Sequence, residues 1–392
     1  MNRNLWLMVV AQGLLLTNNV TLIAVNGLVG LALAPHAWMA TLPVMGYVVG
    51  GALATGPVAW TQSRWGRKAA FQIGHAVALL SALLAAYAVI ISSFWLVVLA
   101  TVVAGYYNAN GQLYRFVAAE LAAEGSREKA VSMVLAGGLA GAVIGPNLAN
   151  WTQHLAGAPF AGAYAALAVL ALVSMMVLGL VEFPPAPRKK AEAGGRSLAE
   201  IMRQPVFIVS TAGAALGYGV MSLLMAASPI AMQMCGHAFK DTALVLEWHV
   251  IGMFAPGFFT GSLIKRYGVM PVMAAGVALN FLCVGVALSG IEVSQFLLSM
   301  FLLGVGWNFL FTAATALSLQ AFRPEEKDRA QAAINFCVFA IMAVTSFSSG
   351  ALVTTQGWTL LNQGSLAPLG LTALALLWYA LASAGKRSQA HG

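Results

Sequence analysis

The stretch AWTQSRWGRKAAF, residues 59–71, is a short basic segment between two long apolar runs. A second segment, GSLIKRYGVM at residues 261–270, separates two apolar runs in the other half of the chain. Aligned, both read small-x-x-x-x-Arg-x-Gly, from Ala59 to Gly66 and from Gly261 to Gly268. The same loop at the same place in each half predicts a chain of two related repeats. The alternative is a pair of unrelated basic loops.

The composition predicts a polytopic membrane protein. Of the 392 residues, 60% are hydrophobic and 8% are charged, whereas roughly 25% of the residues of soluble proteins are charged. Apolar runs of about 20 residues, which is the length of a spanning helix, recur along the chain. We count twelve, at about 5–31, 37–60, 69–91, 94–122, 130–153, 159–182, 205–231, 242–264, 270–289, 294–319, 330–353 and 364–384. The expected fold is therefore an all-α membrane protein with twelve transmembrane helices in two six-helix repeats.

The basic residues predict the orientation and the domain boundaries. Eighteen of the 20 Lys and Arg residues fall on one side of a twelve-span arrangement, and this side is expected to be cytoplasmic. Both termini then lie in the cytoplasm, and the first span is a retained helix. The polar interval from Glu182 to Pro205 predicts a linker over residues 183–204, between bundles at 1–182 and 205–392. The net charge of +8 follows from this asymmetry and indicates no nucleic-acid partner.

The basic loop resembles the signature between the second and third spans of the major facilitator superfamily. Four residues match that signature: Arg64, Gly66, Arg67 and Lys68. Ser63 stands where the signature has an acidic residue, so the charge lock of the family is expected to be weakened. The resemblance covers the whole chain and implies that the protein acts as a monomer in a lipid bilayer. The residues it assigns to the conformational loops are Arg64, Gly66, Arg67, Arg266 and Gly268.

Polar residues inside the spans are costly and are therefore candidates for function. Two interpretations stay open for the amides, namely a polar path lined by spans one, four, seven and ten, or hydrogen bonds between helices. These amides are Gln12, Asn18, Asn19, Asn26, Asn108, Asn110, Gln112, Asn308, Gln331 and Asn335. Arg115 and Glu120, which we expect to pair, and Glu247 are candidates for proton coupling. The sequence shows neither a catalytic triad nor a phosphate loop, and we therefore predict no enzyme.

Two motifs in spans seven and eight suggest a soft-metal site. Met221 and Met225 are spaced i, i+4, as are His249 and Met253, so each pair shares a helix face. The spans are antiparallel about a turn near His237, and the two pairs are equidistant from it, so they are expected to face one another. Thioether and imidazole ligands suit copper. The alternative is that the Met residues fill a hydrophobic core.

The paired motifs resemble the CcoA-type copper importers of bacterial inner membranes, in which the motif residues bind copper. This resemblance implies that the chain imports copper as cargo, without a cofactor, and supplies a cbb3-type cytochrome oxidase. The competing hypothesis is a transporter of a small organic solute, such as a drug or a flavin, with the Met residues packing its cavity.

The turn between these spans carries further soft ligands. The stretch MQMCGH contains Met232, Met234, Cys235 and His237, which are expected to lie at the periplasmic mouth. They are candidates for copper capture, and the alternative is that they are ordinary surface residues.

Overall fold

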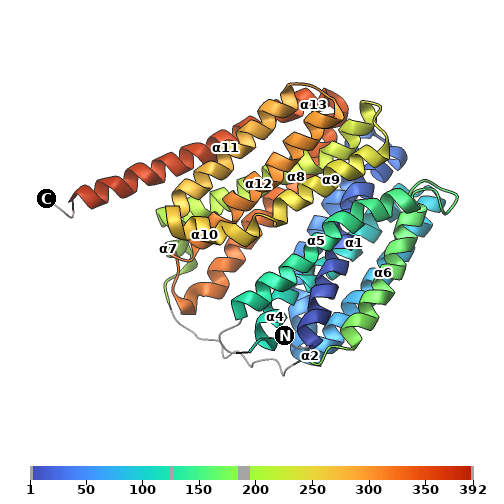
Figure 1. Cartoon of the computed structure of the whole chain (residues 1–392), viewed down its shortest axis with the longest axis horizontal. Coiled ribbons are helices and arrows are strands. Elements are labelled where there is room, and N and C mark those ends of the chain that lie inside the picture. The colour runs from blue at the N-terminus through green and yellow to red at the C-terminus, as the bar shows by residue number, and fades with distance from the viewer. Residues whose placement is uncertain (1–2, 124–126, 184–194, 390–392) are drawn as a thin grey trace.

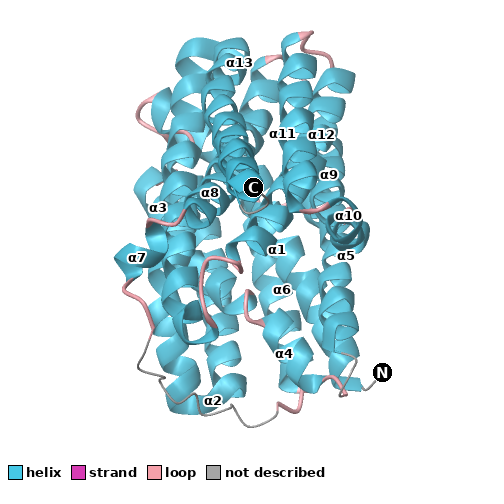
Figure 2. Cartoon of the chain, turned by 90° about the vertical axis from the view of Figure 1, so that its left-hand side faces the viewer, coloured by secondary structure: helices cyan, strands magenta, loops and turns pink. Residues whose placement is uncertain are grey.

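The computed structural model describes residues 3–123, 127–183 and 195–389. Over these ranges the chain is helical, with two short 3-10 helices and no strand (Figure 2). The predicted all-α fold is confirmed. Of the predicted linker, residues 184–194 lie outside the described residues.

The helices form two bundles that lie side by side (Figure 1). The first bundle contains α1 (Arg3–Leu33), η1 (Ala37–Met39), α2 (Leu42–Ile90), α3 (Phe94–Gly111), α4 (Tyr114–Leu121), α5 (Arg127–Thr152) and α6 (Ala161–Gly179). The second contains α7 (Leu198–Met202), α8 (Pro205–Met234), α9 (Phe239–Phe254), α10 (Gly257–Tyr267), α11 (Val269–Leu288), α12 (Val293–Ser318), η2 (Pro324–Glu326) and α13 (Lys327–Gln389).

Several helices do not correspond one to one to a membrane span. At 49 and 63 residues, α2 and α13 are far longer than the roughly 20 residues that cross a bilayer. Each is two helices joined at a glycine with non-helical torsion angles, Gly66 in α2 and Gly357 in α13. Conversely, α9 and α10 form one span bent by 40°, and α3 and α4 together cover the fourth predicted span. With α1, α5, α6, α8, α11 and α12, the described residues contain the twelve predicted spans.

The two basic loops have the same backbone conformation. Gly66 lies at φ 79° and ψ 170°, and Gly268 lies at φ 90° and ψ 166°. Only glycine adopts such torsion angles without strain. The repeated Arg-x-Gly therefore marks the same sharp turn between consecutive spans in both bundles, as expected for a structural repeat.

The bundles contact each other mainly at the end opposite the linker. There, the Thr41 hydroxyl donates to the carbonyl of Phe347 at 3.2 Å and accepts from the backbone N–H of Gly350 at 3.0 Å. Phe160 and Phe239 pack edge to face at 5.0 Å in the same region. The ion pairs near the linker, among the described residues, each stay within one bundle. The protein is therefore closed at one end and open towards the linker.

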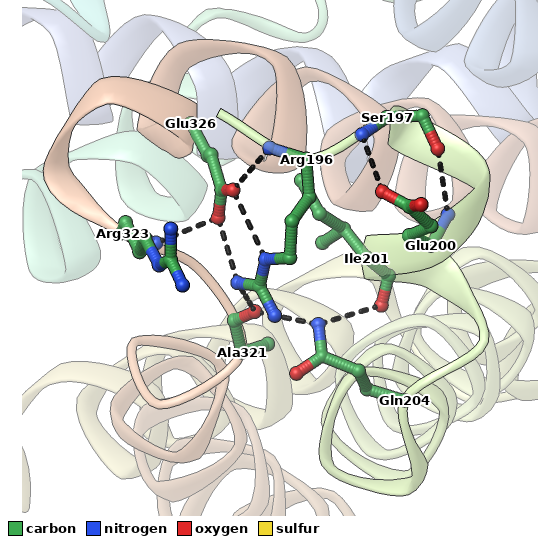
Figure 3. Close-up of polar contacts among 8 residues, drawn as sticks. All are labelled: Arg196, Ser197, Glu200, Ile201, Gln204, Ala321, Arg323 and Glu326. Carbon is green, nitrogen blue, oxygen red and sulfur yellow. Dashed lines mark hydrogen bonds and ion pairs between the residues drawn. The ribbon is translucent and has the colours of Figure 1, made fainter. Parts of the chain in front are cut away.

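The last part of the linker is attached to the second bundle (Figure 3). Arg196 donates to both carboxylate oxygens of Glu326, at 3.0 and 2.7 Å, and its backbone N–H donates to the same group at 2.6 Å. Glu326 is fully buried, and the guanidinium of Arg196 holds the pKa of this carboxyl well below its usual range. Arg196 and Gln204 both donate to the carbonyl of Ala321. The division of the chain at 182 and 205 stays a prediction, while these contacts attach residues 196–204 to the second bundle.

Candidate functional site

An amide cluster lies in the first bundle, near the middle of α1. The Asn19 side chain accepts a hydrogen bond from the Tyr47 hydroxyl at 2.5 Å and donates to Asn108 Oδ1 at 3.1 Å. Gln112 Nε2 approaches the same oxygen of Asn108 at 3.5 Å. We call Asn19, Tyr47, Asn108 and Gln112 the amide cluster. Because Asn108 and Gln112 are spaced i, i+4, they form a polar stripe that leads towards the open end.

An aromatic cluster lies in the second bundle. Trp307 and Phe311 are spaced i, i+4 on α12, and their rings stack at 5.2 Å with an interplanar angle of 9°. Tyr218 packs edge to face on both, at 5.2 and 5.3 Å, and Phe254 packs on Trp307 at 6.5 Å. Trp307 is 8% exposed, whereas the other three rings are half-buried. We call Tyr218, Phe254, Trp307 and Phe311 the aromatic cluster.

The two clusters are joined through one apolar core that extends across both bundles. Tyr47 of the first bundle and Trp307 of the second both belong to this core, and Tyr218 packs against it. Together the clusters offer flat apolar ring surfaces on one side and amide donors and acceptors on the other. Such a combination is typical of small-molecule binding sites, in which a few polar groups fix the orientation of a largely apolar ligand.

The amides predicted from the sequence divide between two roles. Asn19, Asn108 and Gln112 belong to the amide cluster, and Asn335 is exposed on α13. Others form hydrogen bonds within one bundle. Asn26 accepts a hydrogen bond from the Tyr164 hydroxyl, and Asn110 donates to the Ala70 carbonyl. Asn308 accepts from the Thr260 hydroxyl and donates to the Met253 carbonyl. Hydrogen bonding between helices is thus confirmed for several of the amides, while the polar path stays a prediction.

Sequence reasoning missed the aromatic members of the site, which are Tyr47, Tyr218, Phe254, Trp307 and Phe311. Their signal in the sequence is weak, because aromatic residues are common throughout membrane spans. A pair of rings spaced i, i+4 in a span predicted to line the cavity, as in GWNFLF at residues 306–311, is the feature that points to them.

The expected pair of Arg115 and Glu120 is not formed. Glu120 instead pairs with Arg67 at 2.5 Å. Glu120 thereby supplies the acidic partner that the basic loop lacks at Ser63. Arg115 is exposed on α4 and lies 5.0 Å from the ring of its neighbour Phe116.

The remaining loop and coupling candidates lie apart from the two clusters. Glu247 on α9 accepts a hydrogen bond from Asn147 Nδ2 on α5 at 2.9 Å, across the closed end. Arg64 is exposed, and Arg266 lies 5.2 Å from the ring of Tyr267. The conformational role of the basic loops and the coupling role of Arg115, Glu120 and Glu247 stay predictions.

The four predicted metal ligands are buried beside the site. Met221, Met225 and Met253 belong to the main apolar core, and His249 is fully buried. His249 directs Nδ1 to the Met300 carbonyl on α12 at 2.7 Å, while its Nε2 has no hydrogen-bond partner among the described residues. No cluster of three or more His, Cys, Asp or Glu side chains that could hold a metal occurs in the described part of the chain.

The predicted capture residues differ in exposure and in the groups they contact. Met232 is fully buried, whereas Met234 is 54% exposed. His237 bonds through Nε2 to the Ile291 carbonyl at 2.7 Å and packs on Phe296. Cys235 is half-buried, and this burial raises the pKa of its thiol.

A small cavity lies inside the first bundle, away from the aromatic cluster. Its volume is about 10 Å³, and it is lined by Asn18, Leu22, Tyr107 and Tyr164, among others. That volume holds at most one water molecule, so this cavity is too small for an organic solute.

Comparisons with known proteins identify the family. The sequence pattern of the Major Facilitator Superfamily matches residues 5–247. The chain is 38% identical over 364 residues to the riboflavin transporter RfnT of Brucella anthropi, covering 92% of this chain and 91% of that protein. It is 26% identical to the uncharacterized transporter YddS of Bacillus subtilis, over 87% of this chain and 82% of that one. The crystal structure of a D-xylose–proton symporter superposes with a TM-score of 0.76 at 15% identity, over 96% of both chains.

These comparisons correct the predicted function. The expectation of copper import for an oxidase is wrong, because a relative that matches nearly the whole chain is a riboflavin transporter. The resemblance to copper importers rested on i, i+4 spacings, which buried core residues produce equally well. The family match and the relative with 38% identity support a multi-pass membrane transporter, and the structural likeness supports the fold. The chain belongs to the major facilitator superfamily.

Proposed function

We propose that the protein is a secondary transporter of a small organic solute of the flavin class. The observation that carries this proposal is the aromatic cluster of the second bundle, which shares one apolar core with Tyr47 of the amide cluster in the first bundle. A relative with 38% identity that is named a riboflavin transporter supports the same class.

The chemistry of the two clusters suits a flavin. An isoalloxazine ring is flat and largely apolar, and aromatic side chains pack on such rings at centroid distances of 4.5–7 Å. The polyol tail of riboflavin carries hydroxyl groups that both donate and accept hydrogen bonds. Asn and Gln side chains do the same. We therefore assign the ring to the aromatic cluster and the tail to the amide cluster.

Transport proceeds by alternating access of the two bundles to opposite sides of the membrane. We assign the protein to the bacterial inner membrane, with both termini and the linker in the cytoplasm, in accordance with the positive-inside rule. In this orientation the structure, which is open towards the linker, is inward-facing. The protein acts as a monomer.

Uptake of radiolabelled riboflavin tests the proposal. A bacterial strain that can neither make nor import riboflavin should accumulate the label, and grow on low riboflavin, only when it expresses this protein. The matched control is a strain with the same expression level of a Tyr218→Ala, Phe311→Ala variant, which removes two rings of the aromatic cluster. Equal accumulation in the strain without the protein would refute the proposal.

A further inference from the structure

We propose that the indole N–H of Trp307 is the donor that recognises a carbonyl oxygen on the ring of the solute. This inference rests on the proposed function and deepens it, because it assigns the residue that selects among flat ring systems. The class of ligand is a planar heteroaromatic ring with a carbonyl acceptor on its edge.

The first observation is that this donor has no partner. Trp307 is 8% exposed, and its Nε1 is buried with no acceptor in the described part of the chain. Buried polar groups in folded proteins are almost always hydrogen-bonded, and the exceptions call for an explanation. A donor held ready for a ligand acceptor is such an explanation.

The second observation is the arrangement of the rings. Phe311 covers one face of the indole in a nearly parallel stack, while Tyr218 and Phe254 pack at steep angles of 86° and 62°. We place the solute against the edge of the indole, which carries the N–H. Tryptophan donates but does not accept hydrogen bonds. The edge of the solute must therefore present an acceptor, and an amino group at that position is rejected.

The third observation is the location of Trp307 relative to the other residues of the site. Trp307 sits within the aromatic cluster and belongs, together with Tyr47 of the amide cluster, to one apolar core. A solute whose ring contacts Phe311 and Tyr218 can thus reach Asn19 and Asn108 with a polar tail. Trp307 then fixes which edge of the ring points into the second bundle.

The experiment compares riboflavin with analogues in which one ring carbonyl oxygen is replaced by sulfur, at either of the two carbonyl positions. Sulfur is the weaker acceptor, so the wild-type protein should transport one of the analogues with a KM at least threefold higher than that of riboflavin. Trp307→Phe keeps a ring but loses the N–H. It should raise the KM for riboflavin about tenfold, as for loss of a buried hydrogen bond worth about 1.4 kcal/mol, and should abolish the preference for oxygen over sulfur.

The matched control is Trp358→Phe, because Trp358 is buried to the same degree, at 7% exposed, but packs on Phe296 at 5.0 Å, outside the aromatic cluster. It should leave both the KM and the oxygen preference unchanged. Equal effects of Trp307→Phe on riboflavin and both analogues would overturn the inference while leaving riboflavin transport intact.

Two further outcomes are decisive. If Trp307→Phe does not reach the membrane, the wild-type protein alone gives the answer, because transport of both sulfur analogues with the KM of riboflavin excludes a carbonyl donor. A wild-type protein that transports no flavin at all would overturn both the inference and the proposed function.

Discussion

Replacing Tyr47 by Phe tests whether the amide cluster binds the solute. The substitution deletes the hydroxyl that donates to Asn19 Oδ1 at 2.5 Å, and this oxygen then keeps only the long contact of 3.4 Å with Asn18. A neutral hydrogen bond contributes about 1 kcal/mol net, and Asn19 loses its fixed orientation towards Asn108. If the amide must be oriented to meet the polar tail, the loss corresponds to about a fivefold rise in KM for riboflavin.

The assay is the initial rate of radiolabelled riboflavin uptake, with the amount of protein in the membrane measured in parallel. The matched control is Tyr106→Phe, which deletes a hydroxyl in the same bundle that bonds to Thr61 at 3.0 Å and does not contact the amide cluster. Both variants lose one partly buried hydrogen bond, so their thermal stabilities should fall to a similar extent. A KM that rises equally in both variants, or in neither, would refute the role of the amide cluster.

Three other predictions concern the linker, the core and the orientation. Arg196→Gln should lower the melting temperature at pH 7. The difference in melting temperature from wild type should narrow as the pH falls below about 4.3, the usual pKa of Glu, because the low pKa of Glu326 stabilises the fold only while that carboxyl is ionised. Arg203→Gln, on the same linker segment but exposed, should show no such difference. Met221→Leu should leave riboflavin uptake and folding nearly unchanged, since volume-conserving core substitutions usually cost less than about 1.5 kcal/mol, and a large loss of uptake would show that the thioether has a chemical role. Cys235 should react with an impermeant thiol reagent in intact spheroplasts once Cys283 and Cys337 are replaced, and because burial raises its pKa the rate should keep rising with pH beyond pH 8.5, where an ordinary thiol levels off; protection from the reagent would contradict the orientation.

The twelve spans and the repeated loop could be predicted from the sequence because both depend on local properties. Span length follows from bilayer thickness, and the glycine of each Arg-x-Gly is required by a positive φ that the structure shows at Gly66 and Gly268. Neither prediction depends on which helices pack against each other.

The site itself depends on how the helices pack, which local patterns do not determine. The i, i+4 spacing of His249 and Met253 shows that they share a helix face, but not that the imidazole turns towards the Met300 carbonyl of α12. Arg115 and Glu120, five positions apart, lie on different sides of α4, and Glu120 meets Arg67 from another helix. Likewise, no local pattern could place Tyr47 of the first bundle and Trp307 of the second in one apolar core.

The most direct measurement of the central claim is counterflow in liposomes that contain only the purified protein. Vesicles loaded with unlabelled riboflavin and diluted into a trace of labelled riboflavin should transiently accumulate the label, because exchange through the protein needs no energy source. Vesicles loaded with ribitol, which has the tail but no ring for the aromatic cluster, should not. Accumulation that does not depend on internal riboflavin, or none with either load, would contradict flavin transport by this protein.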